Sequence, residues 1–118
     1  MQRHSISFKN AARGIYIATT SQLNIRTHII AATIVCLLAV WLEVSLIEGL
    51  ILLAAISTVF FSEMINTALE FLANAVTMEP SVNIGLAKDV SAGAVLIAAI
   101  FSAIIGALIF VPKIIEMM

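Results

Sequence analysis

Three long stretches of the chain contain no Asp, Glu, Lys or Arg, and they restrict the fold more than any other feature. They cover residues 27–42, 49–62 and 90–112. The last stretch exceeds the roughly 20 apolar residues that cross a bilayer as a helix, whereas the other two need flanking residues to do so. Charged residues make up 11% of the chain, against about 25% in a typical soluble domain. We therefore predict an all-α integral membrane protein.

Within a single domain over residues 1–118, we predict a surface helix followed by three spanning helices. The N-terminal residues alternate apolar and basic side chains, a pattern typical of an amphipathic helix on a membrane surface. Ser45 and Glu48 have the spacing of a capping box, so a helix should begin directly after Ser45. The predicted bounds are 1–20 for the surface helix, and 25–42, 46–77 and 84–112 for the spanning helices.

The distribution of charge predicts an orientation. Basic residues gather before the first span and Lys88 follows the second, whereas Glu43 and Glu48 lie between these spans. By the positive-inside rule, the N-terminus and the loop at residues 78–89 face the cytoplasm. The basic residues suit anionic lipid headgroups or a nucleotide better than nucleic acid. The single cysteine, Cys36, excludes an intrachain disulfide.

One face of the second predicted span carries a polar stripe. At about 100° per residue, its members lie within about 60° of one direction, while the other positions around them are apolar. Glu63 lies about 26 Å beyond the helix start, near the cytoplasmic membrane boundary, and Glu70 lies about 10 Å further. Such a stripe should face a neighbouring helix or subunit rather than lipid. The stripe consists of Glu63, Asn66, Thr67, Glu70, Asn74 and Thr77.

Two carboxylates with a carboxamide between them suit a magnesium–phosphate site. Mg²⁺ prefers oxygen ligands and is often held by one or two carboxylates and substrate phosphates, while phosphoryl transfer also needs an acceptor for the hydroxyl proton. Lys88 and Asp89 would add a phosphate-binding ammonium and a hydrogen-bond acceptor. For the polar stripe, the alternative is a solvated helix face. For Lys88 and Asp89, the alternative is that membrane topology and the helix dipole alone account for their positions. His28 is interpreted as an interfacial residue.

The sequence resembles the prokaryotic diacylglycerol kinase and undecaprenol kinase family over nearly its whole length. The resemblance is carried by EMINTALE at residues 63–70, AKDVSAGAV at 87–95, FKNAARGI at 8–15 and IFVPK at 109–113. It implies a homotrimer in the bacterial inner membrane, with active sites shared between subunits at the cytoplasmic face. The implied reaction transfers the γ-phosphate of Mg²⁺–ATP to the hydroxyl of undecaprenol or diacylglycerol.

The resemblance also implies residue roles. Glu63 matches the catalytic base, Asn66 the amide beside it, and Glu70 a metal ligand. Nucleotide contacts are expected from Lys88 and Asp89, and from Asn10 and Arg13 in the matching N-terminal segment, where headgroup binding is the alternative. Gln22 takes the place of a second metal-binding glutamate and is expected to contact metal and nucleotide.

Two departures from the family pattern leave other functions open. Gln22 and Asn74 stand where the family has acidic residues, so the site has two fewer formal charges with which to hold Mg²⁺. A catalytically impaired relative that acts as a non-enzymatic membrane oligomer is the main alternative. A small proton-coupled exporter is the third reading, but it requires a carboxylate near the bilayer midplane, and Glu63 is predicted at the edge.

Overall fold

The computed structural model of the protein describes residues 3–21, 23–76, 79 and 81–118. These residues form helices α1 (Arg3–Ser21), α2 (Leu23–Trp41), α3 (Leu46–Val76) and α4 (Val82–Met117). No strand occurs in this part of the chain. The prediction of an all-α fold is confirmed.

Three of these helices are long and apolar enough to cross a membrane: Asn24–Trp41, Leu46–Val76 and Val82–Met117. Most of their large apolar side chains are exposed in the single chain, among them Leu37, Phe61 and Phe101. The buried apolar residues are few and mostly small, such as Ala55 and Ala98. An exterior this apolar is suited to lipid tails or to other subunits.

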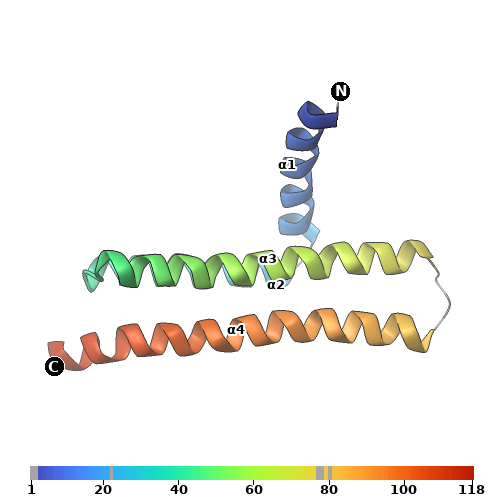
Figure 1. Ribbon diagram of the computed structural model, residues 1–118. Coiled ribbons are helices and arrows are strands. Elements are labelled where there is room, and N and C mark those ends of the chain that lie inside the picture. Colours follow the sequence, from blue (N-terminus) through green and yellow to red (C-terminus); the bar gives the residue numbers. More distant parts are fainter. Residues whose placement is uncertain (1–2, 22, 77–78, 80) are drawn as a thin grey trace.

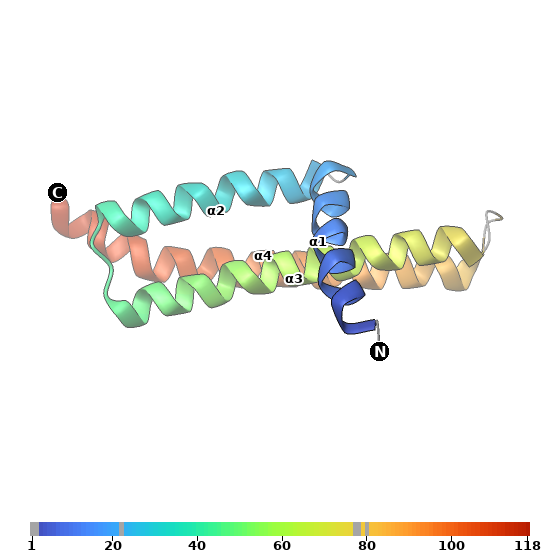
Figure 2. The ribbon, with the colours of Figure 1, turned by 90° about the horizontal axis from the view of Figure 1, so that it is seen from above.

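The helices are arranged around a long antiparallel pair. Figure 1 shows α3 and α4 side by side, with α1 leaving them crosswise. Figure 2 shows α2 beside the first part of α3, and α3 and α4 continuing past α1 to the loop that joins them. Residues of α1 face residues of α3 across a shared hollow, at Gly14, Ile17 and Ala18 on one side and Met64, Thr67 and Phe71 on the other.

The bend between α1 and α2 is held by Arg26. Its guanidinium donates hydrogen bonds to the backbone carbonyls of Thr19 and Thr20 in the last turn of α1. Carbonyls at a helix end have no partner within the helix, and a basic side chain at this end also suits the helix dipole. Arg26 therefore fixes how α1 leaves the bundle, and α1 in turn packs on α3 with Ala18 only 2% exposed.

The start of α3 has the predicted capping box. The backbone N–H of Ser45 donates to Glu48 Oε1 at 2.8 Å, and the N–H of Glu48 donates to Ser45 Oγ at 3.1 Å. Glu48 also forms an ion pair with Lys113 near the end of α4, with Nζ and Oε1 3.0 Å apart. The same glutamate therefore caps α3 and ties it to α4 at the end remote from the α3–α4 loop.

Replacement of Ser45 by Ala is expected to destabilise the protein by about 1 kcal/mol, because the N–H of Glu48 then loses its partner. Thermal unfolding in detergent micelles measures this change. Ser57→Ala is the matched control, since the Ser57 hydroxyl only bonds the carbonyl of Leu53 within α3. An equal shift in both variants would contradict a capping role for Ser45.

Helix α4 differs from its predicted bounds of 84–112 at both ends. It begins at Val82, because the Ser81 side chain accepts a hydrogen bond from the N–H of Ile84. It continues through Pro112 to Met117. A proline removes one backbone hydrogen bond from a helix, and here the last turns are also held by the ion pair between Lys113 and Glu48. The predicted stop at Pro112 is therefore wrong.

Candidate active site

Glu63 lies in the buried face of α3, where its neighbours at helical spacing are Val59 and Thr67. Its side chain is only 2% exposed. Oε1 of Glu63 lies 3.4 Å from Nε2 of His28 on α2. A carboxylate removed from water loses hydration energy unless a polar or basic group replaces the water. His28 is the one basic side chain in contact with Glu63 among the described residues.

One turn further along α3, Asn66 connects α3 to α4. Its Nδ2 donates to Glu70 Oε1 at 3.0 Å, and its Oδ1 accepts a hydrogen bond from the Ser91 hydroxyl at 2.6 Å. Both bonds are consistent with the same orientation of the Asn66 amide, in which Nδ2 points to Glu70 and Oδ1 points to Ser91. Asn66 thus fixes one oxygen of Glu70 and leaves the other for a ligand. Glu70 is half-buried beside α4.

Lys88 lies on α4 within reach of the last part of α3. Its Nζ donates to Oδ1 of Asn74 at 3.0 Å. Asn74 is neutral, so it orients the ammonium of Lys88 while no carboxylate in this contact offsets the positive charge. Asp89 is exposed on the next position of α4. The structure therefore brings Lys88 to the α3 residues of the polar stripe.

The other predicted site residues are not joined to this group. Asn10 and Arg13 are exposed on α1, and no hydrogen bond or ion pair connects them to α3 or α4 within the described residues. Gln22, predicted to contact metal and nucleotide, lies outside the described residues, as does Thr77 of the polar stripe.

Sequence reasoning missed two members of the site, His28 and Ser91. Both contacts cross between helices, so they depend on packing that the spacing within one helix does not reveal. One signal was present for His28. Together with Ile25, Ala32 and Val35 it follows helical spacing, and all of these residues are buried or half-buried. A histidine in an apolar stripe faces a neighbouring helix rather than the interface.

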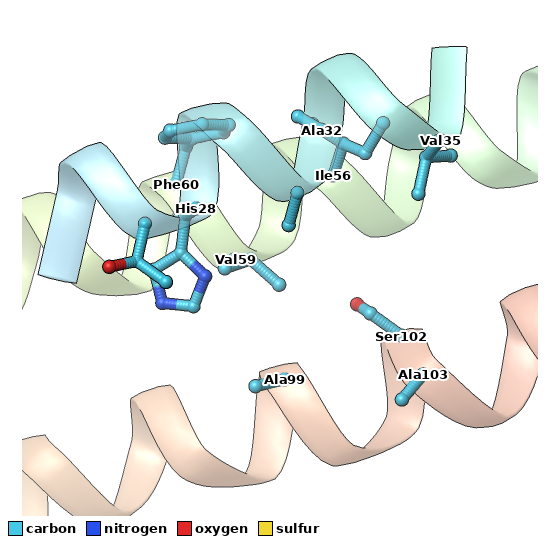
Figure 3. Close-up of a pocket in the computed structure, with 11 residues that line it drawn as sticks. His28, Ala32, Val35, Ile56, Val59, Phe60, Ala99, Ser102 and Ala103 are labelled. Carbon is cyan, nitrogen blue, oxygen red and sulfur yellow. The ribbon is translucent and has the colours of Figure 1, made fainter. Parts of the chain in front are cut away.

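A cavity of about 370 Å³ lies between α2, α3 and α4. Figure 3 shows the His28 ring pointing into it, with Val59 and Ile56 of α3 on one side and Ala99 and Ser102 of α4 on the other. Its walls are almost entirely apolar. His28 thus borders an apolar space on one side and contacts Glu63 on the other.

The donor set is suited to Mg²⁺ shared with phosphates. No cluster of three or more His, Cys, Asp or Glu side chains occurs in the described parts of the chain. Mg²⁺ does not need one, because it retains waters and is commonly bound by one or two carboxylates and substrate phosphates. The free oxygen of Glu70, oriented by Asn66, is the best ligand that these residues offer.

Comparison with known proteins identifies the family. The model of the prokaryotic diacylglycerol kinases matches residues 9–110, which include the polar stripe, Lys88 and Ser91. The chain belongs to the prokaryotic diacylglycerol kinase family. The predicted resemblance is therefore confirmed, and the chain is a lipid kinase with membrane-spanning helices.

Relatives within the diacylglycerol kinase family differ in name. The chain is 37% identical to the undecaprenol kinase of Bacillus subtilis, over 96% of this chain and 92% of the relative. It is 32% identical to a diacylglycerol kinase of Synechocystis, over 96% of this chain and 65% of the relative. It is 29% identical to the diacylglycerol kinase of Escherichia coli, over 78% of this chain and 75% of the relative.

Proposed function

We propose that this kinase transfers the γ-phosphate of ATP, with Mg²⁺, to the hydroxyl of a membrane lipid alcohol. The observation that carries the proposal is the group formed by Glu63, Asn66, Glu70 and Lys88 on α3 and α4. It lies near the level where α1 crosses α3, since Met64, Thr67 and Phe71 face α1. With α1 on the membrane surface, the site is where a lipid hydroxyl can meet a soluble nucleotide.

The residues divide the work of an in-line transfer. Glu63 accepts the proton of the lipid hydroxyl. The hydroxyl oxygen forms a bond to the γ-phosphorus, and the bond between this phosphorus and the oxygen that leaves with ADP breaks. Lys88 and Asp89 contact the nucleotide, and Glu70 would hold Mg²⁺, which when bound offsets the charge of the phosphates. Such transfers depend on positioning and charge stabilisation. Asn66 contributes position, because it bonds Glu70 and Ser91 at once.

Undecaprenol is the proposed acceptor, and diacylglycerol is the second candidate. The undecaprenol kinase of Bacillus subtilis matches nearly the full length of both chains, at higher identity than either diacylglycerol kinase described above. Eight of the 11 residues that line the cavity next to His28 are apolar, and the polar ones are Thr27, His28 and Ser102. Such a lining suits the hydrocarbon chain of a polyprenol better than the ester groups of a glycerolipid.

The proposed setting is the bacterial inner membrane, with the N-terminus and the α3–α4 loop in the cytoplasm. The charge distribution supports this orientation. A homotrimer with shared sites is the proposed assembly. The exposed apolar surface of α2, α3 and α4 supports subunit contacts, and the separation of Asn10 and Arg13 from the α3–α4 residues supports completion of the site by a neighbouring α1.

Purified protein in micelles with labelled ATP and Mg²⁺ is expected to label undecaprenol faster than diacylglycerol, with Glu63→Gln protein as the blank. Thin-layer separation of the lipid products measures both rates. Preferential labelling of diacylglycerol would overturn the choice of acceptor. Protein that is folded and oligomeric but labels neither lipid would instead support the non-enzymatic membrane oligomer, with Gln22 and Asn74 as the marks of a lost activity.

A further inference from the structure

His28 contacts Glu63 but has no role yet in the proposed reaction. It lies on the face of α2 that also carries Ile25, Ala32 and Val35, which are buried or half-buried. The buried stripe of α3 consists of Leu52, Ala55, Val59, Glu63 and Thr67. Each stripe carries one ionisable residue, and these two meet, with Nε2 and Oε1 3.4 Å apart.

The contact requires an explanation beyond filling space. Ionisable residues inside a membrane helix are costly, and they are found in pairs or at functional sites. A buried carboxylate without a polar partner is strongly unfavourable. The His28 side chain is 22% exposed and that of Glu63 is 2% exposed. Glu63 therefore depends on His28 for polar contact more than His28 depends on Glu63.

We propose that His28 is a positioning residue for Glu63. Its Nε2–H donates to Oε1, which fixes the rotation of the carboxylate and directs Oε2 to the lipid hydroxyl. The 3.4 Å separation is long for a hydrogen bond, and such contacts at active sites often shorten only when substrate is bound. The inference rests on the proposed function, because it assumes that Glu63 receives the hydroxyl proton.

The position of His28 also explains why α2 belongs to the site. The cavity that His28 borders lies between α2, α3 and α4 (Figure 3). A lipid chain in this cavity would run beside the His28 ring toward the carboxylate that the ring contacts. His28 thus joins the apolar lipid side of the site to its reacting end, while Lys88 and Asp89 lie on α4 with no hydrogen bond or ion pair to His28 among the described residues.

Two amide variants test the inference. In His28→Gln, the side-chain nitrogen reaches about as far as Nε2 and donates to Glu63, whereas the shorter side chain of His28→Asn does not reach Oε1. We expect His28→Gln to keep kcat within about 3-fold of the unmodified protein. We expect His28→Asn to lower kcat about 10- to 100-fold, since small misplacement of a reacting group has effects of this size. The KM for Mg²⁺–ATP should stay unchanged in both.

The assays are run below the thermal midpoints of both variants, so that a loss of kcat reports on the site and not on unfolding. Equal kcat in the two variants, whether high or low, would overturn the inference. An effect of His28→Asn that appears only as a higher KM for Mg²⁺–ATP, with kcat unchanged, would also overturn it. No transfer by the unmodified protein would overturn the proposed function and this inference together, which separates that failure from the others.

Discussion

Replacement of Glu63 by Gln is expected to lower kcat for lipid phosphorylation by about 10²- to 10⁴-fold, the range that a general base contributes. Glutamine keeps the size of the side chain and a carbonyl oxygen near His28, but it cannot accept the hydroxyl proton. The carboxylate is 2% exposed, so bulk water cannot readily replace it as the proton acceptor. Initial rates with saturating lipid and Mg²⁺–ATP measure the effect.

Glu116→Gln is the control for Glu63→Gln, because it removes the same charge from an exposed position at the far end of α4. It should leave kcat unchanged. The thermal midpoint of Glu63→Gln should stay close to that of the unmodified protein, since the glutamine carbonyl still faces His28 and the variant no longer buries a carboxylate. A kcat within about 3-fold of normal would rule out Glu63 as the base.

Replacement of Glu70 by Gln is expected to lower activity about 100-fold at millimolar Mg²⁺, because it removes the proposed charged ligand from a site that has few carboxylates. The Asn66 amide would still donate to the glutamine carbonyl, so the local hydrogen bonds are kept. Part of the lost activity should return at higher Mg²⁺ concentration. A titration of the rate against Mg²⁺ measures this shift.

A loss in Glu70→Gln that no concentration of Mg²⁺ relieves would argue against a metal role and for a structural one. Asn66→Asp is the second arm of this experiment. It removes the amide N–H that donates to Glu70 Oε1 and puts a carboxylate in its place, so that two carboxylates instead of one attract the cation. Its Mg²⁺ requirement should therefore move opposite to that of Glu70→Gln.

Those parts of the site that lie along one helix were predictable from the sequence. Glu63, Asn66 and Glu70 recur at helical spacing in an apolar helix, and this spacing alone places them on one face. The capping box at Ser45 was predictable for the same reason, because both of its hydrogen bonds are local. The apolar stretches likewise predicted three membrane-length helices, which the structure has.

Contacts between helices were not predictable in this way. The pairing of His28 with Glu63, and of Ser91 with Asn66, depends on the rotation and register of α2 and α4 against α3. In so apolar a chain, many rotations of α2 and α4 about their axes bury apolar residues almost equally well. The hydrophobic pattern of the sequence therefore does not determine which rotation occurs. The predicted end of α4 at residue 112 was too early, because a proline near a helix end costs about one backbone hydrogen bond and the helix continues through Pro112.

The crosswise packing of α1 on α3 determines where the protein absorbs a change in bilayer thickness. α3 has 31 residues and is about 46 Å long, well beyond the roughly 30 Å of hydrocarbon. If α1 rests on the cytoplasmic surface as proposed, its packing beside Thr67 of α3 keeps the site at a constant depth. Hydrophobic mismatch is then accommodated at the opposite ends of the helices, around Trp41 and Lys113. Thicker or thinner membranes should leave the reacting groups at the same height above the lipid.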